Sequence, residues 1–152
     1  MQLQEILTEK SINLSLPGKT KDQVLSQLVE LLAANGAIRQ TDGVIEALAE
    51  REGLGSTGIG HGVAIPHCRS SEISSPTLVL GRTVEPVEFD SIDGKPARIF
   101  FLLVVPENGN NDHLHMLAKI ARLMKGANTR EKLLQVDTPQ AVLQLIGENE
   151  AG

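Results

Sequence analysis

Residues 98–105 read Arg-Ile-Phe-Phe-Leu-Leu-Val-Val, and every side chain after Arg98 is apolar. A strand with one solvated face alternates apolar and polar residues, whereas a strand covered on both faces is apolar throughout. The run has the length of a strand and is far shorter than the ~20 residues of a membrane-spanning helix. Residues 98–105 therefore predict a central strand that helices cover on both sides.

Shorter strands and several helices are predicted around this run. Strands are expected at residues 12–16, 63–65 and 77–80. Apolar residues at helical spacing and capping residues predict five helices, which begin near Thr20, Thr41 or Asp42, Asn111 or Asp112, Asn128, and Thr138–Pro139. Because helices and strands interleave, we expect an α/β fold with a mixed sheet of about five strands flanked by helices.

The length and composition favour one domain with one core. The chain has 152 residues, of which 41% are hydrophobic, and chains of roughly 100 to 200 residues usually form one domain. We predict a single domain over residues 1–152, ordered over about 5–148, with a frayed tail from residue 147 onward.

Charge and composition argue against several function classes. The net charge is -5 without a cluster of lysine or arginine, so we expect no nucleic-acid binding and no attraction to anionic membranes. The start of the chain has no basic region followed by an apolar stretch, which predicts a cytoplasmic protein without membrane insertion. Cys68 is the single cysteine and cannot form an internal disulfide.

A glycine-rich segment precedes the strand predicted at residues 63–65. Five glycines fall within residues 53–62, which is denser than a helix or strand tolerates and predicts tight turns. The segment lacks the Gly-Lys-Ser or Gly-Lys-Thr ending of a nucleotide-binding P-loop, and it precedes a strand rather than a helix. We therefore expect no nucleotide site there.

The four histidines form two pairs that suggest one site. His61 and His67 bracket the predicted strand, and His113 and His115 lie at the start of a predicted helix. Pro66 restricts the backbone before His67, which places that histidine at a strand end rather than within a ladder. A neutral imidazole can act as a nucleophile near neutral pH. The alternative, a histidine that only hydrogen-bonds in the core, is about equally compatible with the spacing.

His113 is the better candidate of the second pair. Unpaired N–H groups and the dipole of a first helical turn favour an anion there. His113 and His115 point about 200° apart, so only one can face the site. His113 lies at the edge of the predicted core-facing stripe of residues 114, 117, 118, 121 and 124. The alternative is a solvated histidine in the capping turn.

Two other kinds of chemistry are weaker interpretations. His61, His67 and either His113 or His115 could converge on zinc, but their spacing matches no known zinc pattern. The chain has no Gly-x-Ser-x-Gly elbow, and Cys68 directly follows His67, which argues against serine and cysteine hydrolases.

Residues 51–68 carry a resemblance to a known family. They read Arg-Glu-Gly-Leu-Gly-Ser-Thr-Gly-Ile-Gly-His-Gly-Val-Ala-Ile-Pro-His-Cys, which resembles the phosphorylation-site signature of mannitol/fructose-type enzyme IIA domains of the bacterial phosphotransferase system. Residues 112–115 resemble the second-histidine segment of that family. Within it, the chain looks most like the nitrogen-regulatory enzyme IIA. The resemblance implies a mannitol-type IIA fold.

The resemblance also implies roles for individual residues. His67 would be phosphorylated, and His113 would support the phosphoryl group. Arg51 would contact the phosphoryl oxygens, which suits a guanidinium fork. The weaker binding candidates of the same segments are Ser56, Thr57 and His115. The resemblance implies no cofactor and no metal.

The implied donor is an HPr-type, NPr-like phosphocarrier protein. The acceptor or listener would be a regulated transporter, a sensor kinase or a IIB protein. We expect a partly apolar docking surface that includes Ile59, Val63 and Met116. Two alternatives stay open, namely a sugar-specific IIA component that feeds a IIB protein, and a metal- or protein-binding module without transfer activity.

Overall fold

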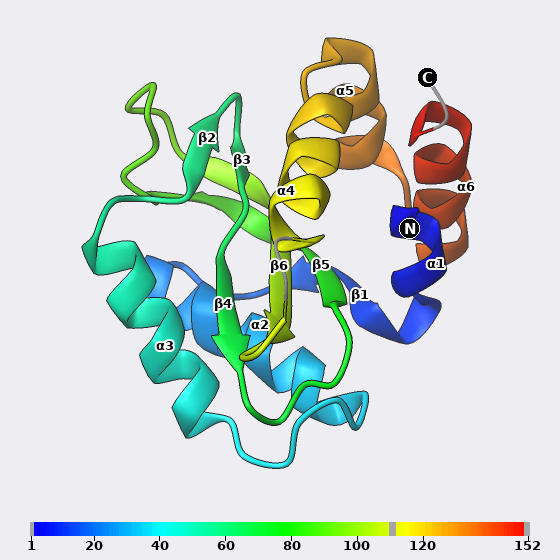
Figure 1. The fold of residues 1–152 in the computed structure, drawn as a ribbon. Helices are drawn as coiled ribbons and strands as arrows, with labels where there is room; N and C mark the ends of the chain where they lie inside the picture. Colours follow the sequence, from blue (N-terminus) through cyan, green and yellow to red (C-terminus); the bar gives the residue numbers. More distant parts are fainter. Residues whose placement is uncertain (1, 110–111, 151–152) are drawn as a thin grey trace.

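A six-stranded mixed sheet forms the centre of the computed structural model, which describes residues 2–109 and 112–150. The strands are β1 (Ile12–Leu16), β2 (Gly58–Gly60), β3 (Val63–Ala64), β4 (His67–Ser70), β5 (Thr77–Val87) and β6 (Ala97–Pro106). The order is β1-β5-β6-β3-β2, and β4 follows β3 along the same side of β6. β5 and β6 are antiparallel, whereas β6 runs parallel to β3 and β4, so the prediction of a mixed sheet is confirmed (Figure 1).

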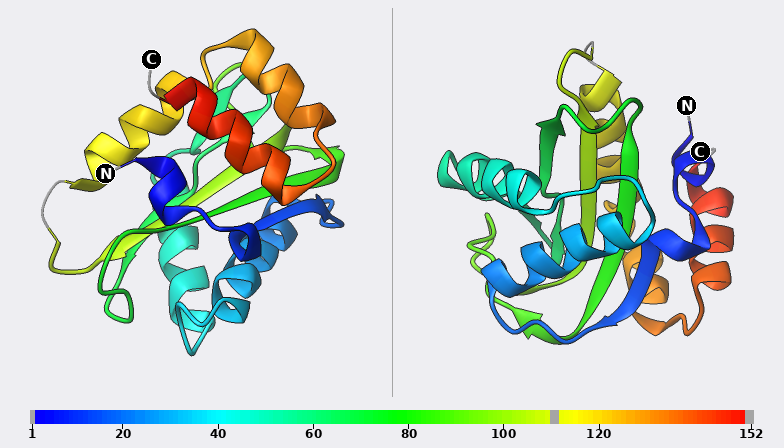
Figure 2. Two further views of the ribbon diagram at one scale, coloured as in Figure 1. Left: turned by 90° about the vertical axis from the view of Figure 1, so that its right-hand side faces the viewer. Right: turned by 90° about the horizontal axis from the view of Figure 1, so that it is seen from below.

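Helices cover both faces of this sheet (Figure 2). They are α1 (Leu3–Ile6), α2 (Lys21–Ala34), α3 (Asp42–Gly53), α4 (Asp112–Leu123), α5 (Ala127–Gln135) and α6 (Pro139–Glu150), with a 3₁₀ turn at Glu9–Ser11. The core residues of α2 and α3 pack on one face, and those of α1, α4, α5 and α6 pack on the other. Among the described residues, no helix has both the length and the apolar character needed to cross a bilayer.

Strand β6 is covered on both faces, as its sequence predicts. Ile99, Phe101 and Leu103 belong to the core under α4–α6, whereas Phe100 and Leu102 belong to the core under α2 and α3. The apolar side chains from Ile99 to Val105 are each at most 5% exposed. Because successive side chains of a strand point to opposite faces, one apolar strand serves both cores.

Two strands lie where none was predicted. The glycine-rich segment contains β2, which pairs with β3 through a turn at Gly60, His61 and Gly62, all with positive φ. Glycine at position 58 permits a close approach, since an added Cβ would lie 2.9 Å from the Cα of Ser91. The expectation that His67 lies outside a ladder is wrong, because His67 is the first residue of β4 and pairs with Leu103.

The core-facing side of α4 also differs from the prediction. Leu114 is 55% exposed, whereas Met116 and Ile120 are buried. Leu117, Ala121 and Met124 of the predicted stripe contact the core as predicted. Packing of α4 against β6 and α6 also buries Met116, Ile120 and Leu123, which were not predicted. His113 precedes Met116 by three residues, so it still lies near the packed side of the helix.

The helix ends show further differences. The segment before residue 12 forms α1, and α5 starts at Ala127 with Gly126 rather than Asn128 at its N-cap. The prediction of a frayed tail from residue 147 is wrong as far as Glu150, because α6 continues to that residue and its carboxylate accepts the Leu3 N–H. Asn111 lies outside the described residues, as does the side chain of Asp112.

Gly81 of β5 lies in close contact with side chains of β1 and α2. A Cβ at this position would be 2.4 Å from Leu16 Cδ1 and 2.8 Å from Leu28 Cδ2. We therefore expect Gly81→Ala to lower the free energy of unfolding by about 1–3 kcal/mol through overpacking, measured by urea denaturation.

Gly43→Ala is the matched control for this substitution. Gly43 lies in α3, and a Cβ there would meet no atom within 4 Å. The control should leave stability unchanged or raise it by up to ~1 kcal/mol, since alanine is the better helix former. Equal effects of the two substitutions would contradict the overpacking argument.

Candidate functional site

His67 has a fixed ring orientation at the start of β4. Its Nδ1 lies 2.8 Å from the carbonyl oxygen of Ile65. A carbonyl can only accept, so Nδ1 carries the proton and Nε2 keeps its lone pair. The backbone is held as well, because the Leu103 N–H donates to the Pro66 carbonyl at 3.0 Å. The result is a partly buried imidazole with one nitrogen free to react.

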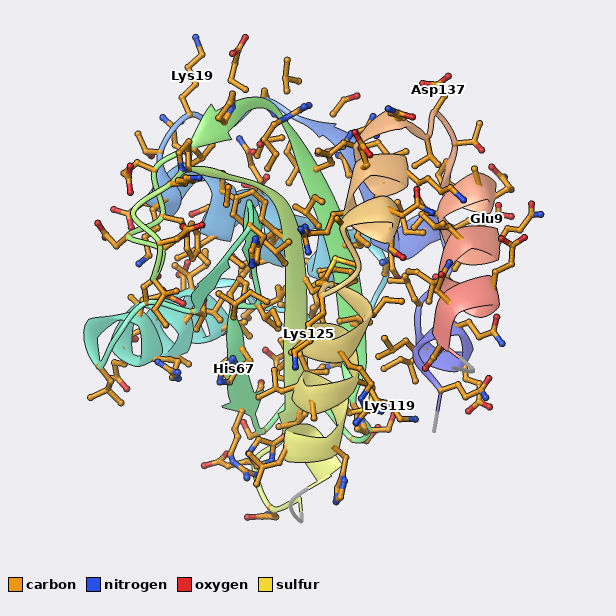
Figure 3. The ribbon with its side chains drawn as sticks, turned by 90° about the horizontal axis from the view of Figure 1, so that it is seen from above. Glu9, Lys19, His67, Lys119, Lys125 and Asp137 are labelled. Atoms are coloured by element: carbon orange, nitrogen blue, oxygen red, sulfur yellow. The ribbon has the colours of Figure 1, made fainter. Side chains whose placement is uncertain are left out.

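A cavity of about 850 Å³ opens beside this ring, between α3, the edge strand β4 and α4. Figure 3 shows His67 on β4, with α3 on one side and α4 on the other. The lining side chains include Arg51 and Leu54 at the end of α3, His67, Cys68 and Arg69 of β4, and His113 of α4. The structure thus brings together His67, His113 and Arg51.

Arg51 lies in the last turn of α3. Its Nη1 donates to the Gly55 carbonyl at 2.9 Å, which fixes the guanidinium against the glycine-rich segment. A guanidinium has five N–H donors, so one bond leaves donors available for an anion in the cavity.

Burial and the nearby charge of Arg51 favour the neutral form of His67. Burial lowers the pKa of His67 below the ordinary 6.5, and the positive charge of Arg51 and the proximity of His113 lower it further. The hydrogen bond to Ile65 and the charge of Glu52 act in the opposite direction, but the pKa of His67 stays lowered overall. A neutral imidazole is the nucleophilic form.

His113 faces the cavity and His115 does not. His113 accepts a hydrogen bond at Nδ1 from Nη2 of Arg69 at 3.3 Å. Since a guanidinium only donates, this bond places the proton of the neutral His113 ring on Nε2. His115 is exposed and is absent from the cavity lining. The structure therefore does not support His115 as a binding residue.

Ser56 and Thr57 use their hydroxyls inside the protein. The Ser56 hydroxyl donates to the Phe89 carbonyl at 2.6 Å, and the Thr57 hydroxyl donates to the carboxylate of Glu52. Neither residue lines the cavity. Both hydroxyls stabilise the loop through internal hydrogen bonds. This geometry therefore does not support direct contact of Ser56 or Thr57 with an anion in the cavity.

The other reactive groups do not compete with His67. Burial raises the pKa of the Cys68 thiol to about 12, so the thiol stays protonated. His61 is exposed at the β2–β3 turn, where its N–H donates to Asp93. Within residues 2–109 and 112–150, no three His, Cys, Asp or Glu residues are arranged to hold a metal ion.

The sequence matches a known family over nearly its whole length. The family model described as "Phosphoenolpyruvate-dependent sugar phosphotransferase system, EIIA 2" matches residues 5–149. The chain belongs to this family. It is therefore an EIIA-type phosphoryl carrier of the phosphotransferase system, as the resemblance of residues 51–68 implied.

Relatives of two kinds are similarly close within this EIIA family. The chain is 37% identical to a nitrogen regulatory protein from Pseudomonas aeruginosa, covering 100% of this chain and 99% of that protein. It is 36% identical to the fructose-specific EIIA component of Haloferax volcanii, covering 90% and 89%. It is 32% identical to the fructose-specific EIIABC component of Bacillus subtilis over 99% of this chain. That alignment covers only 24% of the length of the Bacillus subtilis protein.

A solved EIIA structure confirms the fold. The crystal structure of nitrogen regulatory protein IIA-Ntr from Neisseria meningitidis has a TM-score of 0.88 and 38% identity to this chain. The match covers 95% of this chain and 98% of the other. The α/β fold with a mixed sheet is thus the fold of this EIIA relative.

Several residues that line the EIIA cavity were not predicted as site residues, among them Arg69 and Leu54. Arg69 follows His67 by two positions and therefore shares its face of β4, a relation that a prediction of β4 would have revealed. Leu54 is 86% exposed at the cavity; it lies within residues 51–68, but no role was predicted for it. No sequence pattern distinguished Leu54 from an ordinary core leucine.

The lowered pKa of His67 predicts how the EIIA site depends on pH. We expect the ring to titrate below 6.5, so His67 should stay neutral and competent for transfer as the pH falls through that value. Because the unfolded chain binds this proton more readily, His67 also favours the folded state above pH ~6.5 and less so as the pH falls below it. NMR titration of the His67 ring nitrogens measures the shift, with the histidines of the urea-unfolded chain as reference. A midpoint at or above 6.5 would contradict the expectation.

Proposed function

We propose that this chain accepts a phosphoryl group on Nε2 of His67 from an HPr-type, NPr-like phosphocarrier protein and signals through its phosphorylation state. The observation that carries the proposal is the fixed Nδ1–H tautomer of His67, which leaves Nε2 as the nucleophile in a cavity shared with Arg51 and His113. Family membership supports the same chemistry.

The transfer is a displacement at phosphorus. The lone pair of His67 Nε2 forms the new P–N bond while the P–N bond to the donor imidazole breaks, and that imidazole leaves with the electron pair. The proton stays on Nδ1 and continues to donate to the Ile65 carbonyl, which stabilises the positive charge that develops on the ring. Arg51 supplies N–H donors to the equatorial oxygens, and the Nε2–H of His113 supplies another, so that positioning and charge stabilisation carry the catalysis.

The surface around the cavity suits a protein donor, although its apolar residues differ from the predicted ones. Val63 and Met116 are buried, and Ile59 is 38% exposed. Leu54, which lines the cavity, is more exposed, at 86%. An exposed leucine at the cavity rim offers an apolar contact to a docking protein.

The nitrogen-regulatory role is favoured by the coverage and by the structural match. A nitrogen regulatory protein from Pseudomonas aeruginosa aligns over 100% of this chain, and IIA-Ntr from Neisseria meningitidis has a TM-score of 0.88. In this role the added charge at His67 would change which transporter or sensor kinase binds the surface. The similar identity to the fructose-specific component of Haloferax volcanii keeps a sugar-specific IIA component, which would feed a IIB protein, as the second candidate.

Intact-mass spectrometry tests the carrier function. The full chain is incubated with phosphoenolpyruvate, enzyme I and either an HPr or an NPr-like protein. A gain of one acid-labile phosphoryl group (~80 Da) is expected. No gain with any competent donor, or stoichiometric zinc in the purified protein, would refute the carrier function of this chain.

A second step separates the two candidate roles. The phosphorylated chain is mixed with a fructose-type IIB protein, and the mass of each partner is followed over time. Retention of the phosphoryl group on this chain supports the regulatory role, whereas rapid transfer to the IIB protein supports the sugar-specific role.

A further inference from the structure

Glu52 is a buried carboxylate directly after Arg51, and the transfer chemistry gives it no part. Its side chain is 6% exposed. Oε1 accepts from Lys21 Nζ at 2.9 Å and from the Thr57 N–H at 3.1 Å, while Oε2 accepts the Thr57 hydroxyl. A buried charge is tolerated only when it is paired and hydrogen-bonded, and Glu52 meets both conditions.

Lys21 ties this carboxylate to another part of the fold. Lys21 is the first residue of α2, and its Nζ also lies 4.7 Å from the centroid of the Phe89 ring and 3.9 Å from Asp90. Through Lys21 and Thr57, the Glu52 carboxylate joins the start of α2, the end of α3 and the loop before β2.

Two hydrogen bonds, both made by the backbone of Ile65, connect Thr57 to the His67 ring. The Ile65 N–H donates to the Thr57 carbonyl at 3.0 Å. The Ile65 carbonyl in turn accepts the Nδ1 proton of His67 at 2.8 Å. A shift of Thr57 would therefore move the carbonyl that sets the tautomer and orientation of the His67 ring.

We propose that Glu52 is a positioning residue for His67. Its hydrogen bonds fix the position of Thr57 and thereby keep the Ile65 carbonyl in place as the acceptor of the His67 Nδ1–H, so that Nε2 stays free for transfer. This inference rests on the proposed function for its kinetic consequence, but not for its structural one. Misplacement of a reacting group by a fraction of an ångström to an ångström lowers transfer rates even when the chemistry is intact.

The experiment compares Glu52→Gln and Thr57→Val with the parent chain. Glu52→Gln removes the charge that holds Lys21 and the Thr57 hydroxyl, and Thr57→Val removes the hydroxyl while keeping the backbone N–H. Glu46→Gln is the matched control, since Glu46 is an exposed glutamate of the same helix that does not line the cavity. The readouts are the His67 ring ¹⁵N shifts at mildly alkaline pH, the rate of phosphoryl uptake from the phosphorylated donor, and the urea unfolding midpoint.

The parent chain and Glu46→Gln should show a single tautomer of His67 with the proton on Nδ1. In both test variants we expect signals of the two tautomers and uptake slower by about ten- to a hundredfold, under conditions in which each variant is folded. If Glu52→Gln does not fold, the result for Thr57→Val alone tests the inference.

A single Nδ1–H tautomer in the test variants, or uptake as fast as in Glu46→Gln, would overturn the inference and reduce Glu52 to a stabilising residue. Failure of the parent chain to take up phosphoryl groups would refute the proposed function instead. In that case the tautomer readout alone decides whether Glu52 positions His67.

Discussion

His67→Gln is expected to abolish phosphoryl uptake completely under conditions that fully load the parent chain. Glutamine preserves the approximate size and polarity of the side chain, but its amide nitrogen has no lone pair available for attack. Among the described residues that line the cavity, neither Cys68 nor His113 is suited to replace His67, because the Cys68 thiol stays protonated and the Nδ1 of His113 is held by Arg69. Intact-mass spectrometry after extended incubation measures the effect.

The control for this substitution is His61→Asn. His61 has a φ of 58° at the β2–β3 turn, a conformation that asparagine tolerates well. The bond to Asp93 comes from the His61 backbone and is kept. His61→Asn should therefore take up one phosphoryl group per chain, as the parent chain does. Any acid-labile phosphoryl group on the His67→Gln variant would show that a residue other than His67 accepts it.

Arg51→Ala is expected to slow phosphoryl uptake by about 10²–10³-fold, the usual effect of removing one donor to a developing oxyanion. The endpoint of the reaction should not change, because His67 and its tautomer are intact. The charge of Arg51 helps to lower the pKa of His67. The His67 ring should therefore titrate at a higher pH in Arg51→Ala than in the parent chain. Rapid-quench measurement of uptake from the phosphorylated donor gives the rate.

Two further variants make the Arg51 prediction specific. Arg51→Lys keeps the positive charge without the guanidinium fork, so it should recover part of the rate. Arg39→Ala removes an exposed arginine that does not line the cavity and should leave the rate unchanged. A rate for Arg51→Ala within threefold of the parent chain would exclude Arg51 from the phosphoryl contacts.

Sequence patterns predicted the central parts of the fold. The apolar run at residues 98–105 predicted a strand covered on both faces, and β6 has that environment. Thr20 and Pro139 marked helix starts that the structure confirms. These predictions succeeded because each depends on a local pattern of polarity or capping that nearby residues alone determine.

Short strands and helix orientation were not predictable in the same way. β2 and β4 have three and four residues, too few for a periodic pattern, and they exist because β3 and β6 provide partners. Leu114 and Met116 are equally apolar, so only packing against β6 and α6 could decide which of them is buried.

Sequence patterns were enough to predict the family, the alternation of helices and strands, and the candidates His67, His113 and Arg51. They could not determine that the Ser56 and Thr57 hydroxyls are bonded inside the protein, or that His115 faces away from the cavity. Nor could they determine that Arg69 donates to His113 and that Glu52 binds Lys21 and Thr57. These relations join residues from different elements across the edge of the sheet. Hydrogen-bond direction and burial depend on such distant partners, so only the tertiary structure decides which proton each histidine carries and which nitrogen is free to react.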